Sequence, residues 1–143
     1  MIGQGGFLEY AQIYSNFYGT PKGPVMKYLE EGSDVILEIE MQGARQVKEM
    51  YPEAVLIFVL PPSLEELRNR LTTRGTETEE QVNERLSTSL EEIKQVKDYN
   101  YFIFNENNKT TESAKIIEDI IVAEKNKASR YEKAIIKKFE EEL

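Results

Sequence analysis

Four of the six arginines in the sequence fall within eighteen residues that contain no lysine: Arg68, Arg70, Arg74 and Arg85. A guanidinium grips a phosphate through two N–H groups at once, whereas a lysine ammonium offers only a point charge. Arg74 also precedes Gly75 in a predicted loop between two helices, a layout suited to a segment that closes over phosphates. The alternative is an exposed helix face that pairs with nearby glutamates and adds little stability. Those glutamates are Glu65, Glu66, Glu79 and Glu80.

Two carboxylates, Glu38 and Glu40, close a predicted strand in the run "DVILEIE". Residues two apart on a strand share a face and lie roughly 7 Å apart. In open parallel sheets, ligands bind beyond the carboxyl ends of the strands. The pair is therefore a candidate for orienting a metal ion or for accepting hydrogen bonds from a ligand. The alternative is a solvated face at the end of a strand.

A third carboxylate, Glu9, shares one face of the predicted strand "FLEYAQI" with Phe7, Ala11 and Ile13. An ionised carboxylate only accepts hydrogen bonds, and its two oxygens match two adjacent N–H donors. Guanine presents such a pair at N1 and N2, and adenine does not. Hydroxyls from Tyr18 and Thr20 would then reach a phosphate and the base carbonyl. The alternative is an edge-strand carboxylate that faces water.

The composition limits which functions are open to the chain. Its 143 residues, 40% hydrophobic and 31% charged, fit one compact globular domain. The absence of Cys and His excludes disulfides, zinc sites and nucleophiles that need either residue. A net charge of −8 argues against nucleic-acid binding. No apolar run could span a membrane and no signal peptide is recognisable, so we expect a cytoplasmic protein without a membrane partner.

The hydrophobic pattern predicts strands that alternate with helices, which is typical of a parallel sheet covered on both faces. An opening strand pair leads to a helix over residues 21–32, and a strand over 34–40 gives way to a helix near Met41. The run "AVLIFVLPP" predicts an inner parallel strand. Ser63 and Thr78 each begin a helix with a capping box. A strand over 101–104, a helix through 116–121 and an amphipathic tail to Leu143 complete the chain.

Several of these motifs, taken together and in register, resemble guanylate kinase. They are "FLEYAQIYSNFYGTP", "DVILEIEMQGARQV", "AVLIFVLPPSLEEL", "RLTTRGTETEE", "NERL" and "FN", and the match runs from residue 1 to about 122. The resemblance implies a P-loop kinase-type parallel sheet flanked by helices, an incomplete one here. It also implies a GMP-binding segment (7–33), core strands and a helix (34–62), a lid (63–97) and a C-terminal strand with helices (98–143).

The resemblance further implies transfer of the ATP γ-phosphoryl to GMP with Mg²⁺, and no metal ligand set of the protein's own. By position, Arg74 and Arg85 resemble the lid arginines, and Asn105 resembles the residue beside the adenine, which Arg74 also serves. Glu38 would lie near the phosphates, with a catalytic role. The GMP-binding residues would be Glu9, Tyr18, Gly19, Thr20, Glu40, Gln42 and Gly43.

The sequence departs from the family pattern in two ways. Glu40 stands where the family usually has Asp, so its carboxylate must shift to reach the same donor. No G-x-x-x-x-G-K-[ST] loop occurs in the 143 residues, nor the strand before it and the two arginines after it. We therefore expect a guanylate kinase without its N-terminal third, catalytically incompetent alone. The alternatives are a non-catalytic module that recognises GMP or a protein partner, and a remnant that self-associates through exposed sheet edges.

Overall fold

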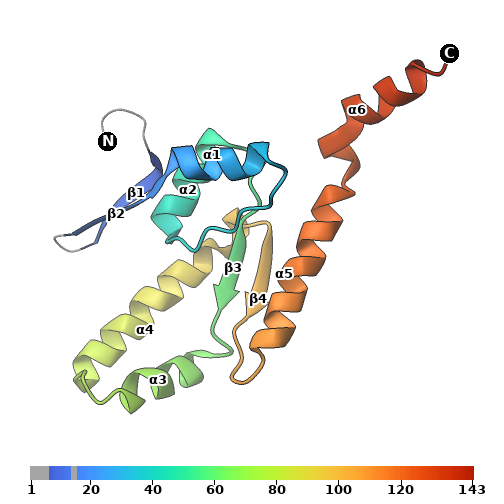
Figure 1. Ribbon diagram of the computed structural model, residues 1–143. Coiled ribbons are helices and arrows are strands. Elements are labelled where there is room, and N and C mark those ends of the chain that lie inside the picture. Colours follow the sequence, from blue (N-terminus) through green and yellow to red (C-terminus); the bar gives the residue numbers. More distant parts are fainter. Residues whose placement is uncertain (1–6, 14–15) are drawn as a thin grey trace. The chain divides into compact units, whose positions relative to one another are not determined.

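The computed structural model describes the backbone of residues 7–13 and 16–143, and side chains from Thr20 onward. The chain divides into two compact units, residues 1–56 and residues 57–143, and each is described by itself (Figure 1). Together they make a mixed α/β protein with a small parallel sheet and several helices, which confirms the predicted fold class. The finer division of the chain into a GMP-binding segment, core, lid and C-terminal part stays a prediction.

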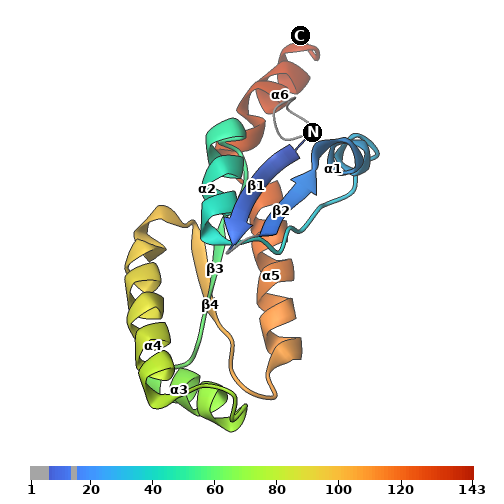
Figure 2. The same cartoon turned by 90° about the vertical axis from the view of Figure 1, so that its left-hand side faces the viewer.

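The first unit contains an antiparallel hairpin and two helices. Strands β1 (Phe7–Ile13) and β2 (Asn16–Pro21) pair, and helices α1 (Lys22–Glu30) and α2 (Met41–Met50) follow (Figure 2). Pro21 is the N-cap of α1, where its fixed φ of −61° suits the entry to a helix. Gly32, with φ of +87°, follows the end of α1 in the left-handed region that glycine adopts without strain. The predicted hairpin and helix are confirmed.

The segment of residues 34–40 was predicted as a strand, and this prediction is wrong for the described chain. Its side chains do alternate as expected, with Leu37 and Ile39 half-buried and Ile36 and Glu38 exposed. However, the segment forms no hydrogen-bonded ladder with any described residue. A segment is a β-strand only where it exchanges backbone hydrogen bonds with a neighbouring strand. An alternating pattern of side chains does not by itself provide that neighbour.

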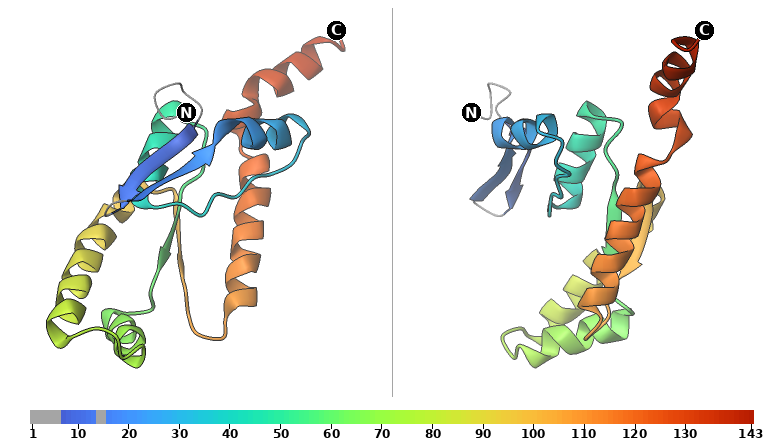
Figure 3. Two further views of the ribbon diagram at one scale, coloured as in Figure 1. Left: turned by 60° about the vertical axis from the view of Figure 1, so that its left-hand side comes forward. Right: turned by 45° about the vertical axis from the view of Figure 1, so that its right-hand side comes forward.

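The second unit is a two-stranded parallel sheet with helices between and after its strands (Figure 3). Its elements are β3 (Ile57–Leu60), α3 (Leu64–Thr73), α4 (Glu79–Ile93), a 3₁₀ helix (Lys94–Asp98), β4 (Tyr101–Phe104), α5 (Thr110–Lys125) and α6 (Ala128–Glu140). Ile57 pairs with Tyr101 and Leu60 with Phe104. The prediction of a parallel strand is confirmed. The prediction that β3 is an inner strand is wrong for the described chain, because β4 is its one neighbour there and Val59 is 53% exposed.

Helices α3 and α4 pack as a hairpin around a small apolar core. Leu71, Val82 and Leu86 are buried there, and Leu67 packs against them. Thr78 and Gln81 form the complete predicted capping box of α4. At α3, Ser63 Oγ accepts the N–H of Glu66 at 3.0 Å, but the Glu66 side chain does not return to the cap and bonds to Asn107 instead. Half of the first predicted box is therefore present.

A buried carboxylate joins the last three elements of the second unit. Glu124 on α5 accepts a hydrogen bond from the Tyr101 hydroxyl at 2.6 Å and from Arg130 Nε at 2.7 Å. These two bonds hold the pKa of Glu124 below its ordinary value, the tyrosine bond being the larger cause. The same bond raises the pKa of Tyr101. The cluster ties the first turn of α6 to α5 and β4.

None of the described helices has the length and apolar character of a membrane span.

Candidate functional site

The turn between α3 and α4 carries one of the predicted phosphate-binding arginines. Arg74 is the C-cap residue of α3 and its side chain is exposed. Gly75 follows with φ of +66°, a conformation that residues with a side chain rarely adopt, and its N–H bonds to the Thr72 carbonyl at 3.0 Å. Thr78 then caps α4. The glycine lets the chain reverse directly after Arg74, between two helices whose ends are fixed.

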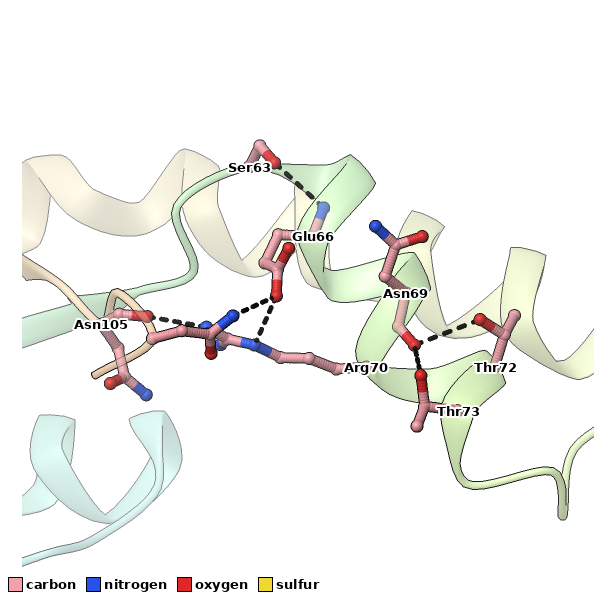
Figure 4. Close-up of polar contacts among 8 residues, drawn as sticks. Ser63, Glu66, Asn69, Arg70, Thr72, Thr73 and Asn105 are labelled. Carbon is pink, nitrogen blue, oxygen red and sulfur yellow. Dashed lines mark hydrogen bonds and ion pairs between the residues drawn. The ribbon is translucent and has the colours of Figure 1, made fainter. Parts of the chain in front are cut away.

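The clustered arginines divide into two engaged residues and two that are not. Arg68 Nη1 donates to Asn83 Oδ1 at 3.0 Å, which links α3 to α4. Arg70 Nη2 donates to the Asn105 carbonyl at 2.9 Å and to Asn107 Oδ1 at 3.0 Å, which links α3 to the loop after β4. Figure 4 shows the Arg70 side chain reaching from α3 to Asn105, with Glu66 beside its Nε.

Arg74 and Arg85, the two predicted lid arginines, are exposed and make no hydrogen bond or ion pair with any described residue. The alternative explanation, pairing with neighbouring glutamates, therefore applies to Arg70 alone, whose Nε lies 3.4 Å from Glu66 Oε1. Two guanidiniums that their own fold does not use remain available to an anion.

Asn105 lies at the carboxyl ends of both strands of the sheet, where ligands of parallel sheets bind. Its N–H donates to the Leu60 carbonyl at 2.7 Å, which continues the ladder by one bond beyond β4. An open cavity of about 250 Å³ lies at this point, with Leu60, Leu67, Arg70 and Asn105 among its lining residues. The structure thus places the predicted adenine-side residue at a hollow between the strand ends and α3.

The predicted base-reading residues lie on the hairpin of the first unit. Glu9 is the Cα partner of Thr20, and Ala11 is that of Tyr18. Because Glu9 and Ala11 are two apart on β1, as Tyr18 and Thr20 are on β2, these backbone positions belong to one face of the hairpin. The side chains of Glu9 and Tyr18, and the surroundings of Gly19, lie outside what the structure describes. Thr20 is half-buried.

The acidic pair of the first unit leads into α2. Glu38 is exposed, and Glu40 is the N-cap residue of α2, whose carbonyl accepts the Ala44 N–H at 2.8 Å. The Glu40 side chain makes no capping hydrogen bond. In the first turn of α2, Gln42 is exposed and Gly43 is buried. Two carboxylates and the first turn of a helix therefore occur together at this point.

The predicted residues thus gather in two sets, one in each unit. The first set is Glu9, Tyr18, Gly19, Thr20, Glu38, Glu40, Gln42 and Gly43, and the second is Arg74, Arg85 and Asn105. Within the described residues, no group of three or more acidic side chains gathers to hold a metal ion. A magnesium ion that arrives with a nucleotide does not need such a group, because proteins usually hold it through one or two carboxylates and the phosphates of the nucleotide.

Sequence reasoning did not single out Asn107, which helps to hold the Asn105 loop against α3. The side-chain amide of Asn107 makes both contacts: Nδ2 donates to Glu66 Oε1 at 2.7 Å, and Oδ1 accepts from Arg70. The loop also contains Asn108, whose φ is +59°. The asparagine-rich run "FNENN" directly after a strand is the one signal in the sequence, since asparagine tolerates left-handed turns.

Comparisons with known proteins agree on one family. The profile described as "Guanylate kinase" matches residues 1–124. Curated proteins with the same name include that of Clostridioides difficile (strain 630), 66% identical over all 143 residues, which cover 69% of it. That of Caldanaerobacter subterraneus subsp. tengcongensis is 48% identical, with 68% of its length covered. The crystal structure of guanylate kinase from Anaplasma phagocytophilum superposes with a TM-score of 0.69 at 35% identity, over 88% of this chain and 60% of that one.

Proposed function

Because this chain belongs to the guanylate kinase family, we propose that its residues serve the transfer of the ATP γ-phosphoryl group to GMP, which gives ADP and GDP. The observation that carries the proposal is the pair of unengaged guanidiniums, Arg74 and Arg85. Phosphoryl transfer needs little covalent chemistry from the protein and depends on positioning and on neutralising charge. Two exposed arginines, Arg74 at the turn between α3 and α4 and Arg85 on α4, are suited to neutralise a transferring phosphoryl group.

Glu9 is proposed to read the guanine base. Its register position opposite Thr20, with Tyr18 two positions away on β2, supports a shared role for the three residues. The carboxylate would accept from guanine N1–H and N2–H, the threonine hydroxyl would meet the base carbonyl, and the tyrosine hydroxyl would meet the GMP phosphate. Glu38 is proposed to lie near the phosphates and Glu40 near the guanine amino group. Gly19, Gln42 and Gly43 complete the proposed GMP-binding set.

Asn105 and the cavity at the strand ends are proposed to receive the adenine side of ATP, with Arg74 nearby on the lid. Two bonds fix the Asn105 backbone, one from its N–H to the Leu60 carbonyl and one from Arg70 to its carbonyl. They support this assignment, because a base needs a rigid polar neighbour to orient it. Mg²⁺ bound with the nucleotide would supply positive charge that neutralises part of the phosphate charge. The protein's own residues hold the nucleotides and exclude competing orientations.

The 143-residue polypeptide is proposed not to complete the transfer by itself. No G-x-x-x-x-G-K-[ST] occurs within it, and the lysine and backbone cradle of that loop hold the donor phosphates in P-loop enzymes. The same observation favours a second candidate function, a module that binds GMP without turnover. A coupled assay of ADP formation with GMP and ATP is expected to show no turnover, and a rate within tenfold of about 10 s⁻¹ would contradict this part of the proposal.

Base selection is tested by calorimetric titration of the chain with GMP and with AMP. A carboxylate that faces the adenine N1 acceptor is repelled by it, whereas guanine donates two hydrogen bonds to the same carboxylate. This contrast should favour the binding of guanine over adenine by roughly 1.5–3 kcal/mol. We therefore expect a GMP preference of about tenfold or more, at millimolar nucleotide. Glu9→Gln should lose the preference, and Glu49→Gln, an exposed carboxylate on α2, should keep it. Equal affinity for the two nucleotides would contradict the assignment of Glu9.

A further inference from the structure

Helix α6 carries an apolar stripe that nothing in the described chain covers. Tyr131, Ile135 and Phe139 follow one another at steps of four, so they lie on one face of the helix, and Ile136 widens this face. Their exposed fractions run from 42% to 61%, and no residue of α6 is buried. We call these four residues the α6 stripe. Apolar residues scattered singly on a surface are normal, but a contiguous row on one helix indicates an interaction surface.

The start of α6 is held in a fixed orientation. Arg130 donates to the buried Glu124 carboxylate, which also accepts the Tyr101 hydroxyl. Arg130 precedes the stripe residue Tyr131, so it points away from the stripe, and its bond fastens the opposite side of the helix. Figure 1 shows α6 continuing as a separate rod past the end of α5. A helix that is already anchored loses little conformational freedom when its free face meets a partner.

The charges along α6 indicate what the partner is. Four charged residues border the stripe, Lys127 and Glu132 toward the start of the segment and Lys138 and Glu142 toward its end. A second copy of the same helix, running antiparallel about Ile135, places Lys127 near Glu142 and Glu132 near Lys138, so that opposite charges meet. It also aligns the helix macrodipoles favourably. A parallel pair would instead bring like charges together at both ends.

We propose that α6 is a self-association surface, on which the α6 stripes of two copies of this chain pack antiparallel around a two-fold axis near Ile135. In such an isologous contact, each residue meets its counterpart from the other end of the helix. Lys127 of one copy and Glu142 of the other then fall within one helical turn. The stripe residues of the two copies interdigitate between these charged ends.

The size of the stripe sets the strength of the association. A large side chain buries about 200 Å², and about half of each stripe residue is exposed, so one copy offers roughly 400 Å² and a pair roughly 800 Å². Specific, stable interfaces bury more than about 1,000 Å² in total. The dimer is therefore a weak, reversible one that forms as the chain is concentrated.

Sedimentation velocity on the 143-residue chain, from about 5 to 500 µM, tests the surface. The apparent mass should rise from 16.6 kDa toward twice that value. The double variant Ile135→Glu, Phe139→Glu should raise the dissociation constant at least tenfold while circular dichroism stays unchanged, because α6 has no buried residue. The charge-matched control Lys133→Ala, Lys137→Ala, on the opposite side of the helix, should associate like the parent chain.

Two results of that experiment would overturn the proposal. A chain that stays monomeric at every concentration has no such surface. A double variant that associates as strongly as the parent uses another surface, such as the open edges of β3 and β4. Neither result bears on the nucleotide titrations, so the fate of this proposal is independent of the proposed function.

Cross-linking tests the orientation, and the chain has no cysteine of its own to interfere. One chain carries Ala128→Cys and a second, differently tagged chain carries Glu142→Cys. After mixing and mild oxidation, the antiparallel pair should give mainly the mixed disulfide, at least fivefold over either symmetric product, because the two positions face each other across the axis. A control with Lys133→Cys in place of the first substitution should give little. Mainly symmetric products would show a parallel pair and overturn the proposed geometry.

Discussion

Helix α3 and the segment that runs from its C-cap into α4 contain arginines in opposite situations. Within α3, Arg68 donates to Asn83 on α4, and Arg70 donates to Asn105 and Asn107 in the loop after β4. From Arg74 to Arg85, the arginines make no bond with any described residue. Within one helical hairpin, arginine thus serves as an internal tie at Arg68 and Arg70, whereas Arg74 and Arg85 are unused cations.

This difference teaches that a cluster of arginines should not be interpreted as a unit. Four arginines close in sequence predict a phosphate site, but two of them are already committed to Asn83 and Asn105. An arginine that ties two elements together cannot move to a ligand without breaking those contacts. An exposed arginine without a partner can do so at no such cost. The comparison therefore separates arginines that stabilise the fold from arginines that are available to bind a ligand. Substitutions at both kinds of position can test this distinction.

The largest expected effect comes from removing the core on which both ends of the hairpin depend. Leu71 is 5% exposed and packs with Val82 and Leu86. Leu71→Ala should lower the free energy of unfolding by about 2–5 kcal/mol, from lost burial and the cavity left behind. Urea denaturation followed by circular dichroism measures it. Leu64→Ala, at a 38% exposed position of the same helix, is the control and should cost far less.

A third engaged arginine, Arg130, sharpens the comparison through its carboxylate partner. Glu124 is 8% exposed, and Glu124→Gln should lower stability at pH 7 by about 1–3 kcal/mol, because a neutral amide oxygen replaces two charge-assisted acceptors. Since the folded pKa is lowered, this contribution is complete above the ordinary value of 4.5 and is lost as the pH falls below it. The gap between parent and variant should therefore shrink from pH 7 to pH 3 in thermal unfolding experiments. A constant gap would mean that the charge is not involved.

The smallest effects compare the two classes of arginine directly. Arg70→Ala should cost about 1 kcal/mol, since it removes the bonds to Asn105 and Asn107 from a half-buried site. Arg74→Ala should change stability by less than about 0.5 kcal/mol. Both values come from the same denaturation series. If Arg74→Ala proved as costly as Arg70→Ala, the distinction between engaged and unused arginines would be lost.

Local elements could be predicted from the sequence because their signals are local. The hairpin before Pro21, the helix starts at Ser63 and Thr78, and the parallel pairing of the strand before Pro61 are confirmed. Each depends on residues within a few positions of one another, or on the general rule that helices connect parallel strands.

What could not be predicted depends on partners far along the chain. The alternation over residues 34–40 is real, yet no pattern within a segment says which strand will pair with it. The hydrogen bond of Arg70 is made to Asn105, which follows it in the sequence only after the whole of α4. The assignments of Glu9, Tyr18 and Thr20 to GMP stay predictions. They require a ligand contact, which the backbone register alone does not supply.

The α3–α4 hairpin also determines the order in which this part of the chain can fold. Ile57 must find Tyr101 across the whole length of α3, α4 and the 3₁₀ helix, and closing so long a loop of flexible chain is slow. Each of the two helices has its own side-chain cap, and the contacts between them are close in sequence. We therefore expect the helical hairpin to form faster than the strand pair. Once formed, it shortens the flexible path between the strands. We therefore expect the parallel pair to assemble after the hairpin, around two helices that are already in place.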